Sequence, residues 1–109
     1  VYRYNIEEKA WTKIKSLKRP LSEYALVQYG QYFIMVGDYS RNNQLMVYDT
    51  KTESTTYFKT NLQGRRYGAS IIDDQLYVFG GIDGNQGSLR QQHYKLSVTS
   101  ILGQVAKLQ

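Results

Sequence analysis

The residues that could do chemistry in this chain are a single histidine and one pair of adjacent carboxylates. His93 is the only histidine, there is no cysteine, and it lies in a strand-like stretch beside Tyr94, which is typical of a structural or surface residue. Asp73 and Asp74 separate two apolar stretches, and such a pair is more typical of a solvated hairpin turn than of a catalytic dyad. We therefore expect no enzyme activity, no catalytic residue, no cofactor and no bound metal.

Phosphate and nucleic acid binding have equally little support in the sequence. The segment GGIDGNQG, residues 80–87, follows an apolar stretch but opens no helix, whereas a phosphate-binding loop leads into one. The many tyrosines and arginines alternate with the strand pattern instead of forming a platform for stacked bases. We do not expect the chain to bind nucleic acid.

One sequence pattern occurs twice along the chain, and the fold that it predicts decides where these residues lie. The stretch SEYALVQYGQYFIMVGD, residues 22–38, is similar to RRYGASIIDDQLYVFGG, residues 65–81, at an offset of 43 residues. This offset places Tyr24 on Tyr67 and Gly37 on Gly80, and a second pair, Tyr-Asn at 4–5 and Tyr-Asp at 48–49, recurs at an offset of 44. Such a period predicts a repeat array whose units bury their apolar faces by stacking on their neighbours.

Each period contains four short runs rich in Tyr, Val, Ile, Phe and Thr, cut apart by Gly, Asn, Asp and Lys. These runs predict β-strands at 24–29, 32–36, 44–48 and 55–59, and again at 67–72, 75–79, 91–96 and 101–105. A pair at 1–4 and 11–14 repeats only the third and fourth strands. The sequence therefore predicts an all-β chain with an outer half unit at 1–14 and full units at 24–59 and 67–105.

In this pattern the chain resembles the kelch repeat of kelch-type β-propellers. That repeat has an Arg, a strand of small and apolar residues, a second strand ending in Gly-Gly, a third carrying Tyr-Asp, and a later Trp. The matching residues are Tyr4, Trp11, Gly37, Tyr48, Asp49, Arg66, Gly80 and Gly81. The departures are Glu23 for the Arg, Asp38 for the second Gly, and Thr55 and Ile101 for the Trp. A WD40 propeller has a similar period, but the chain has neither its Gly-His nor its Trp-Asp pair.

The resemblance implies a kelch-type propeller segment of four-stranded antiparallel blades. Because propellers close with four to eight blades, the two units and a half found here would form an incomplete ring, and we expect the remaining blades to come from the same or another chain. The motif glycines are expected to take positive φ and to let the neighbouring blade approach closely. Tyr48 and Trp11 are expected in the seam between sheets, and Arg66 is expected to bond local backbone.

The net charge of +5 conceals a polarised distribution over the expected loops. The loops on one side collect seven basic residues against three acidic ones, and those on the other side collect six acidic residues against two basic ones. We expect the basic side to form a docking face for an acidic protein surface or peptide. The predicted partner-binding residues are Lys18, Arg19, Tyr39, Arg41, Arg65 and Arg90. The loop 82–89 is expected to adapt to a partner.

The predicted function is a non-catalytic protein–protein interaction or scaffold module within a larger protein, in a cytoskeletal or multiprotein assembly. One alternative is the substrate-recognition domain of a BTB–kelch ubiquitin-ligase adaptor. Another is part of a copper-oxidase-like propeller, whose chemistry needs histidine and a cysteine-modified tyrosine, and a carbohydrate ligand is a further open alternative. The apolar runs are too short for a membrane span, and the lack of cysteines and glycosylation sequons favours an intracellular, cytoplasmic location.

Overall fold

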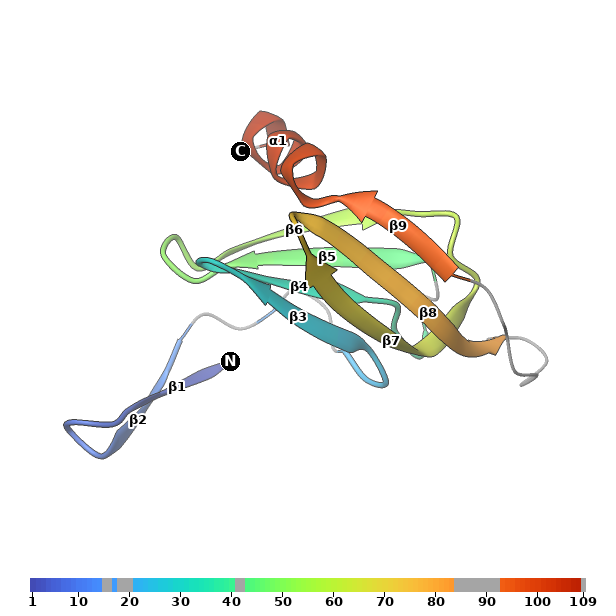
Figure 1. Ribbon diagram of the computed structural model, residues 1–109. Coiled ribbons are helices and arrows are strands. Elements are labelled where there is room, and N and C mark those ends of the chain that lie inside the picture. The colour runs from blue at the N-terminus through green and yellow to red at the C-terminus, as the bar shows by residue number, and fades with distance from the viewer. Residues whose placement is uncertain (15–16, 18–20, 41–42, 84–92, 109) are drawn as a thin grey trace.

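The computed structural model of the chain shows two antiparallel sheets that pack face to face, with a hairpin and a helix at their margins (Figure 1). It describes residues 1–14, 17, 21–40, 43–83 and 93–108. The elements are an N-terminal hairpin of β1 (Tyr2–Asn5) and β2 (Ala10–Lys13); a first sheet of β3 (Ala25–Tyr29), β4 (Tyr32–Val36), β5 (Gln44–Asp49) and β6 (Ser54–Lys59); a second sheet of β7 (Gly64–Ile72), β8 (Gln75–Asp83) and β9 (His93–Ser97); and α1 (Val98–Leu108). The prediction of an all-β fold with antiparallel sheets is confirmed, and neither sheet closes on itself.

The first sheet has the four strands predicted for residues 24–59, in sequence order. Every residue of β5 is buried, because this central strand is covered on both faces. Short turns join β3 to β4 and β5 to β6, and Gly30 takes the positive φ, +56°, that the tight β3–β4 turn requires. The sheet is therefore a simple meander that can be compared strand by strand with the second one.

The prediction of a fourth strand at 101–105 is wrong, because this stretch belongs to α1. Val98, Ile101 and Val105 recur with a helical period and pack on the core between the sheets. Ser97 caps the helix, since its Oγ accepts a hydrogen bond from the Ser100 backbone N–H at 3.3 Å. As a result the second sheet has three strands, and no described strand pairs with the outer edge of β9.

The N-terminal hairpin repeats the β5–β6 hairpin in register. Tyr4 pairs with Trp11 as Tyr48 pairs with Thr55, and the remaining pairs of β1 and β2 follow those of β5 and β6 at the same offset of 44 residues. The burial differs, however. Tyr48 is buried as predicted, but Trp11 is 69% exposed, with its ring beside that of Tyr4 at 5.1 Å between centroids. Our prediction of a buried Trp11 is wrong because no described sheet covers this hairpin as its neighbours cover β5.

The turns of the two hairpins are also the same. The backbone N–H of Glu8 donates to Asn5 Oδ1 at 2.9 Å, and that of Thr52 donates to Asp49 Oδ1 at 3.3 Å. Both bonds join residues three apart at equivalent positions, and each closes an Asx-type turn. The hairpin is thus a second copy of the outer half of the first sheet, as its sequence predicts.

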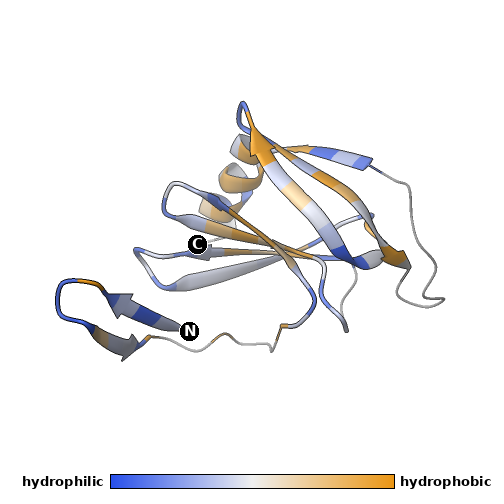
Figure 2. Cartoon of the chain, turned by 60° about the horizontal axis from the view of Figure 1, so that its bottom comes forward, coloured by the Kyte–Doolittle hydropathy of each residue, from blue (hydrophilic) through white to orange (hydrophobic). Residues whose placement is uncertain are grey.

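The two sheets stack head to tail. The front face of the first sheet packs on the back face of the second, with the core between them (Figures 1 and 2). We define the front face of the first sheet as Ala25, Val27, Ile34, Val36, Leu45 and Val47, and the back face of the second as Tyr67, Ala69, Ile71, Leu76, Val78, Tyr94 and Leu96. An interface between non-equivalent faces can be repeated by further units, unlike a two-fold contact.

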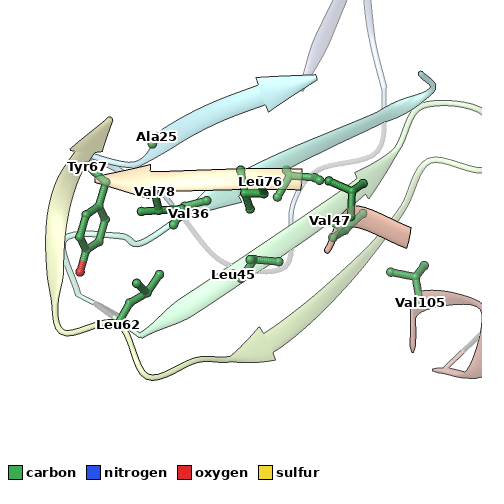
Figure 3. Packing of buried hydrophobic residues seen from close by; sticks show 11 residues of the cluster. Ala25, Val36, Leu45, Val47, Leu62, Tyr67, Leu76, Val78 and Val105 are labelled. Carbon is green, nitrogen blue, oxygen red and sulfur yellow. The ribbon is translucent and has the colours of Figure 1, made fainter. Parts of the chain in front are cut away.

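Glycines let the two sheets approach at the end where β7 begins. The ring of Tyr67 lies between Gly37 of the first sheet and Gly81 of the second: a Cβ on Gly37 would come within 3.2 Å of the ring, and one on Gly81 within 2.7 Å. Figure 3 shows Tyr67 at this end of the core, near Val78 and Leu62. The predicted positive φ is confirmed at Gly37, Gly80 and Gly81, and the predicted close approach of a neighbouring sheet is confirmed at Gly37.

We predict that Gly37→Ala destabilises the chain by about 2–3 kcal/mol and Gly30→Ala by about 1 kcal/mol. Both glycines have positive φ, but a Cβ at Gly30 meets nothing within 4 Å, so this control variant carries only the backbone strain. The difference between the two losses in unfolding free energy measures the cost of the contact between the new Cβ at position 37 and the Tyr67 ring. Urea unfolding followed by circular dichroism measures both losses, and equal losses would contradict the close approach of the sheets.

Candidate functional site

The clearest cluster of charged side chains lies where β3 and β7, the first strands of the two sheets, run next to each other. The Glu23 carboxylate bridges two arginines, with Oε1 at 2.5 Å from an Arg66 terminal nitrogen and Oε2 at 3.0 Å from Arg65 Nε. The Arg66 backbone N–H also donates to the Glu23 carbonyl at 3.1 Å. Glu23 and Arg66 are equivalent residues of the two repeats, and both have positive φ, +55° and +58°.

These contacts fix the charge states of the cluster. The hydrogen bond from Arg66, together with the positive charges of Arg66 and Arg65, holds the pKa of Glu23 below its usual value, despite some burial. The same hydrogen bond and the charge of Glu23 raise the pKa of Arg66. The cluster is thus an ion pair between the two repeats. Our expectation that the Arg66 side chain would bond local backbone is wrong, because its guanidinium pairs with the Glu23 carboxylate instead. Opposite charges at the same repeat position were the sequence signal for it.

An aromatic residue extends this cluster to the surface. The Arg65 guanidinium lies over the ring of Tyr39, with Cζ at 4.3 Å from the ring centroid. Tyr39 is 52% exposed, whereas the Arg65 side chain is only 18% exposed. The loop that carries Tyr39 is held by two hydrogen bonds to Ser22: its carbonyl accepts from the Tyr39 N–H at 2.9 Å, and its own N–H donates to the buried Asp38 carboxylate at 2.8 Å.

The structure therefore brings together two residues of the predicted docking face, Tyr39 and Arg65. The other four predicted partner-binding residues lie outside the described residues: Lys18, Arg19, Arg41 and Arg90. Much of the loop 82–89 lies outside them too. Arg65 is already bound to Glu23, so the surface that a partner would meet at this point consists of the Tyr39 ring and the exposed part of Arg66.

The opposite loops hold a second polar cluster, centred on Asp49. Its side chain is buried and accepts hydrogen bonds from the Gln31 amide at 3.0 and 3.1 Å, from the Lys51 N–H at 2.9 Å and from the Thr52 N–H. Burial alone would raise the pKa of Asp49, but these hydrogen bonds outweigh it and lower the pKa. Asp49 therefore acts as a structural acceptor that joins two turns of the first sheet.

Asp73, Asp74 and His93, the residues considered for catalysis, lie in a turn and on a strand, where their contacts are those of structural residues. Asp73 and Asp74 are exposed at the β7–β8 turn with φ of +49° and +62°, so the prediction of a hairpin tip is confirmed. Asp74 also accepts a 2.6 Å hydrogen bond from the Tyr29 hydroxyl, which raises the pKa of Tyr29 and joins the two sheets. His93 is exposed in β9 and stacks on Tyr77 at 6.1 Å, as predicted for a surface residue. Among the described residues, no three His, Cys, Asp or Glu side chains gather as metal ligands would.

A second apolar cluster lies on the back face of the first sheet, which we define as Tyr24, Leu26, Phe33, Met35, Met46 and Tyr48. Met35, Met46 and Tyr48 are buried, and Ile14, Leu17 and Leu21 pack against them. Leu26 remains 53% exposed and Tyr24 39% exposed. A cavity of about 380 Å³ separates this face from the N-terminal hairpin, with Val1, Arg3 and Ile14 on its opposite side.

Comparison with known proteins gives no relative: no family model matches the chain, and no curated protein is significantly similar to it. In the part of the chain that the structure describes, no helix has the length and apolar character needed to cross a membrane.

We predict that Asp49→Ala lowers the free energy of unfolding by about 2–3 kcal/mol and Asp49→Asn by about half as much. The asparagine keeps an acceptor for the turn, as Asn5 does for Glu8, but loses the charge and one acceptor for Gln31.

Because folding lowers the pKa of Asp49, the advantage of the native chain over Asp49→Asn should be complete above about pH 4 and disappear as the pH falls through the lowered value. Urea unfolding of both chains between neutral pH and pH 2 measures this. An advantage that persists or grows in acid would contradict it.

Proposed function

We propose that this chain is a segment of a repeat protein of the kelch-propeller type and that it acts as a protein–protein interaction or scaffold module. The observation that carries the proposal is the head-to-tail stacking of equivalent sheets. The first strands β3 and β7 are neighbours, and Glu23 of one repeat pairs with Arg66 of the next. Adjacent first strands are what stacked propeller blades would have.

This stacking gives the molecule a rigid edge suited to binding another protein. The Glu23–Arg66 pair and the Ser22 hydrogen bonds hold the β4–β5 loop against the start of β7, and Tyr39 is presented there with half of its surface free. A tyrosine held against an arginine is the kind of residue that contributes most to protein interfaces, since little conformational entropy is lost on binding.

The chemistry of the partner follows from the charge of this edge. Arg65 and Arg66 are two cations that share the single carboxylate of Glu23, and the Arg66 side chain is 56% exposed. An acidic peptide with an apolar or aromatic residue would complement both the cations and the Tyr39 ring. The proposed partner is therefore an acidic protein segment, bound without catalysis.

The test measures binding of a panel of fluorescent peptides rich in Glu and Asp, with matched Gln and Asn peptides, by anisotropy in low and moderate salt. We expect the acidic peptides alone to bind, and Tyr39→Ala to weaken their binding about five- to thirtyfold. Tyr39→Phe, which keeps the ring, should bind nearly as the native chain does.

The matched control is Tyr2→Ala, because Tyr2 is also an exposed tyrosine, 63% exposed, but belongs to the N-terminal hairpin. This variant should bind the acidic peptides normally. Equal binding of acidic and amide peptides, or equal losses for Tyr39→Ala and Tyr2→Ala, would overturn the proposed docking edge.

A further inference from the structure

We propose that a cavity between β6 of the first sheet and the β9–α1 segment of the second binds a small amphipathic anion, an apolar chain with one anionic head group, as in a fatty acid. The cavity has a volume of about 510 Å³. Sites for small molecules commonly have volumes of about 300–1,000 Å³. Its lining includes none of Tyr39, Arg65 and Arg66, so this inference goes beyond the proposed docking edge.

The cavity exists because a helix follows β9 where the first sheet has a fourth strand. α1 packs on the core through Val98 and Val105, which are both buried. Because a helix is a cylinder about 10 Å across, it touches a neighbouring sheet along one line and leaves space beside that line. Ser100, Ile101 and Gln104 have the spacing of neighbours on one side of a helix, and this side lines the cavity opposite β6.

The inner part of the cavity is apolar. Leu45 of β5 and Leu62, which follows β6, are buried there at 2% and 3% exposure, and Figure 3 shows both in the core. Phe58, Tyr94 and Ile101 also line the cavity and are only half-buried. An apolar ligand would remove their remaining surface from water, so the hydrophobic effect favours an apolar chain in this space.

The charged residues that line the cavity are both lysines. Lys59 ends β6 and Lys95 lies in β9, so the cations come from the two sides of the cavity, and both residues are exposed. The described lining contains no Asp or Glu, and α1 has no acidic residue in its first turn. An anionic head group at the rim would therefore meet two cations and no described anion, whereas a cationic head group would be repelled.

The experiment compares decanoate, decanol and decyltrimethylammonium, which share one chain length and differ in the charge of the head group. Their binding to the whole chain is measured by isothermal titration calorimetry, below the concentrations at which they form micelles. We expect decanoate to bind about fivefold more tightly than decanol, and decyltrimethylammonium to bind least. From octanoate to decanoate, each added methylene should tighten binding about two- to fourfold, because it is buried in the apolar part of the cavity.

Lysine variants test the charge requirement. Lys59→Gln and Lys95→Gln should each weaken binding of decanoate about two- to fivefold and leave binding of decanol nearly unchanged. The matched control is Lys13→Gln, because Lys13 is also exposed but belongs to the N-terminal hairpin and does not line the cavity. This variant should bind decanoate as the native chain does.

A second pair of variants fills the cavity without changing the core. Gln104→Trp places a large ring on the side of α1 that lines the cavity and should weaken binding of all three ligands about tenfold or more. Ala106→Trp places the same ring elsewhere on the helix, at a residue that does not line the cavity, and should have little effect. Both positions are exposed, so both variants should fold.

The position of the ligand is read from the methyl signals of the chain in nuclear magnetic resonance spectra. Decanoate should shift the methyl signals of Leu45, Leu62 and Ile101, which line this cavity. The methyl signal of Met35 should not move, because Met35 lines the separate cavity behind the first sheet.

The inference would be overturned if decanol bound as tightly as decanoate, if Lys13→Gln and Lys95→Gln caused equal losses, or if Met35 shifted in place of Ile101. The absence of binding would overturn it as well. Binding of acidic peptides at Tyr39 is a separate readout: Tyr39→Ala should not change binding of decanoate, and Gln104→Trp should not change binding of the peptides. Either proposal can therefore fail while the other holds.

Discussion

The structure depends on one contact, the packing of the Tyr67 ring between two glycines. Gly37 directly follows β4 and Gly81 lies within β8, and both are close enough to the ring that a Cβ would meet it. The two glycines face opposite edges of the aromatic ring, which sets how closely the two sheets approach at this end. The remaining core, from Val36 and Val78 to Val105, fills the space that this approach leaves.

The charged cluster of Glu23, Arg65 and Arg66 also forms because the two sheets approach each other closely. Once β3 and β7 are neighbours, equivalent residues of the two repeats come within hydrogen-bond distance, and Glu23 meets Arg66. Two like charges at this repeat position would repel each other. An exposed ion pair adds little stability by itself, so its main effect is to favour this pairing of units and this loop arrangement.

The sequence predicted the strands well because the strand signal is local. Alternation and turn residues located β3 to β6 within a residue, and the hairpin repeat was visible in Tyr4-Asn5 and Tyr48-Asp49. The helix α1 was missed although Val98, Ile101 and Val105 have helical spacing, because the repeat pattern demanded a strand there. The exposure of Trp11 and the Glu23 bridge could not be predicted from local pattern, since both depend on which sheet lies opposite.

The two outer faces of this stack differ in their side chains. The front face of the second sheet carries Ser70, His93 and Lys95 at positions that are aliphatic in the first sheet, and a helix replaces its fourth strand. This face is mixed, because it also leaves Ile72 57% exposed and Phe79 48% exposed. The back face of the first sheet leaves Leu26 and Tyr24 partly exposed beside Met35. Both outer faces of the stack therefore keep exposed apolar side chains, and the hydrophobic effect favours covering either of them.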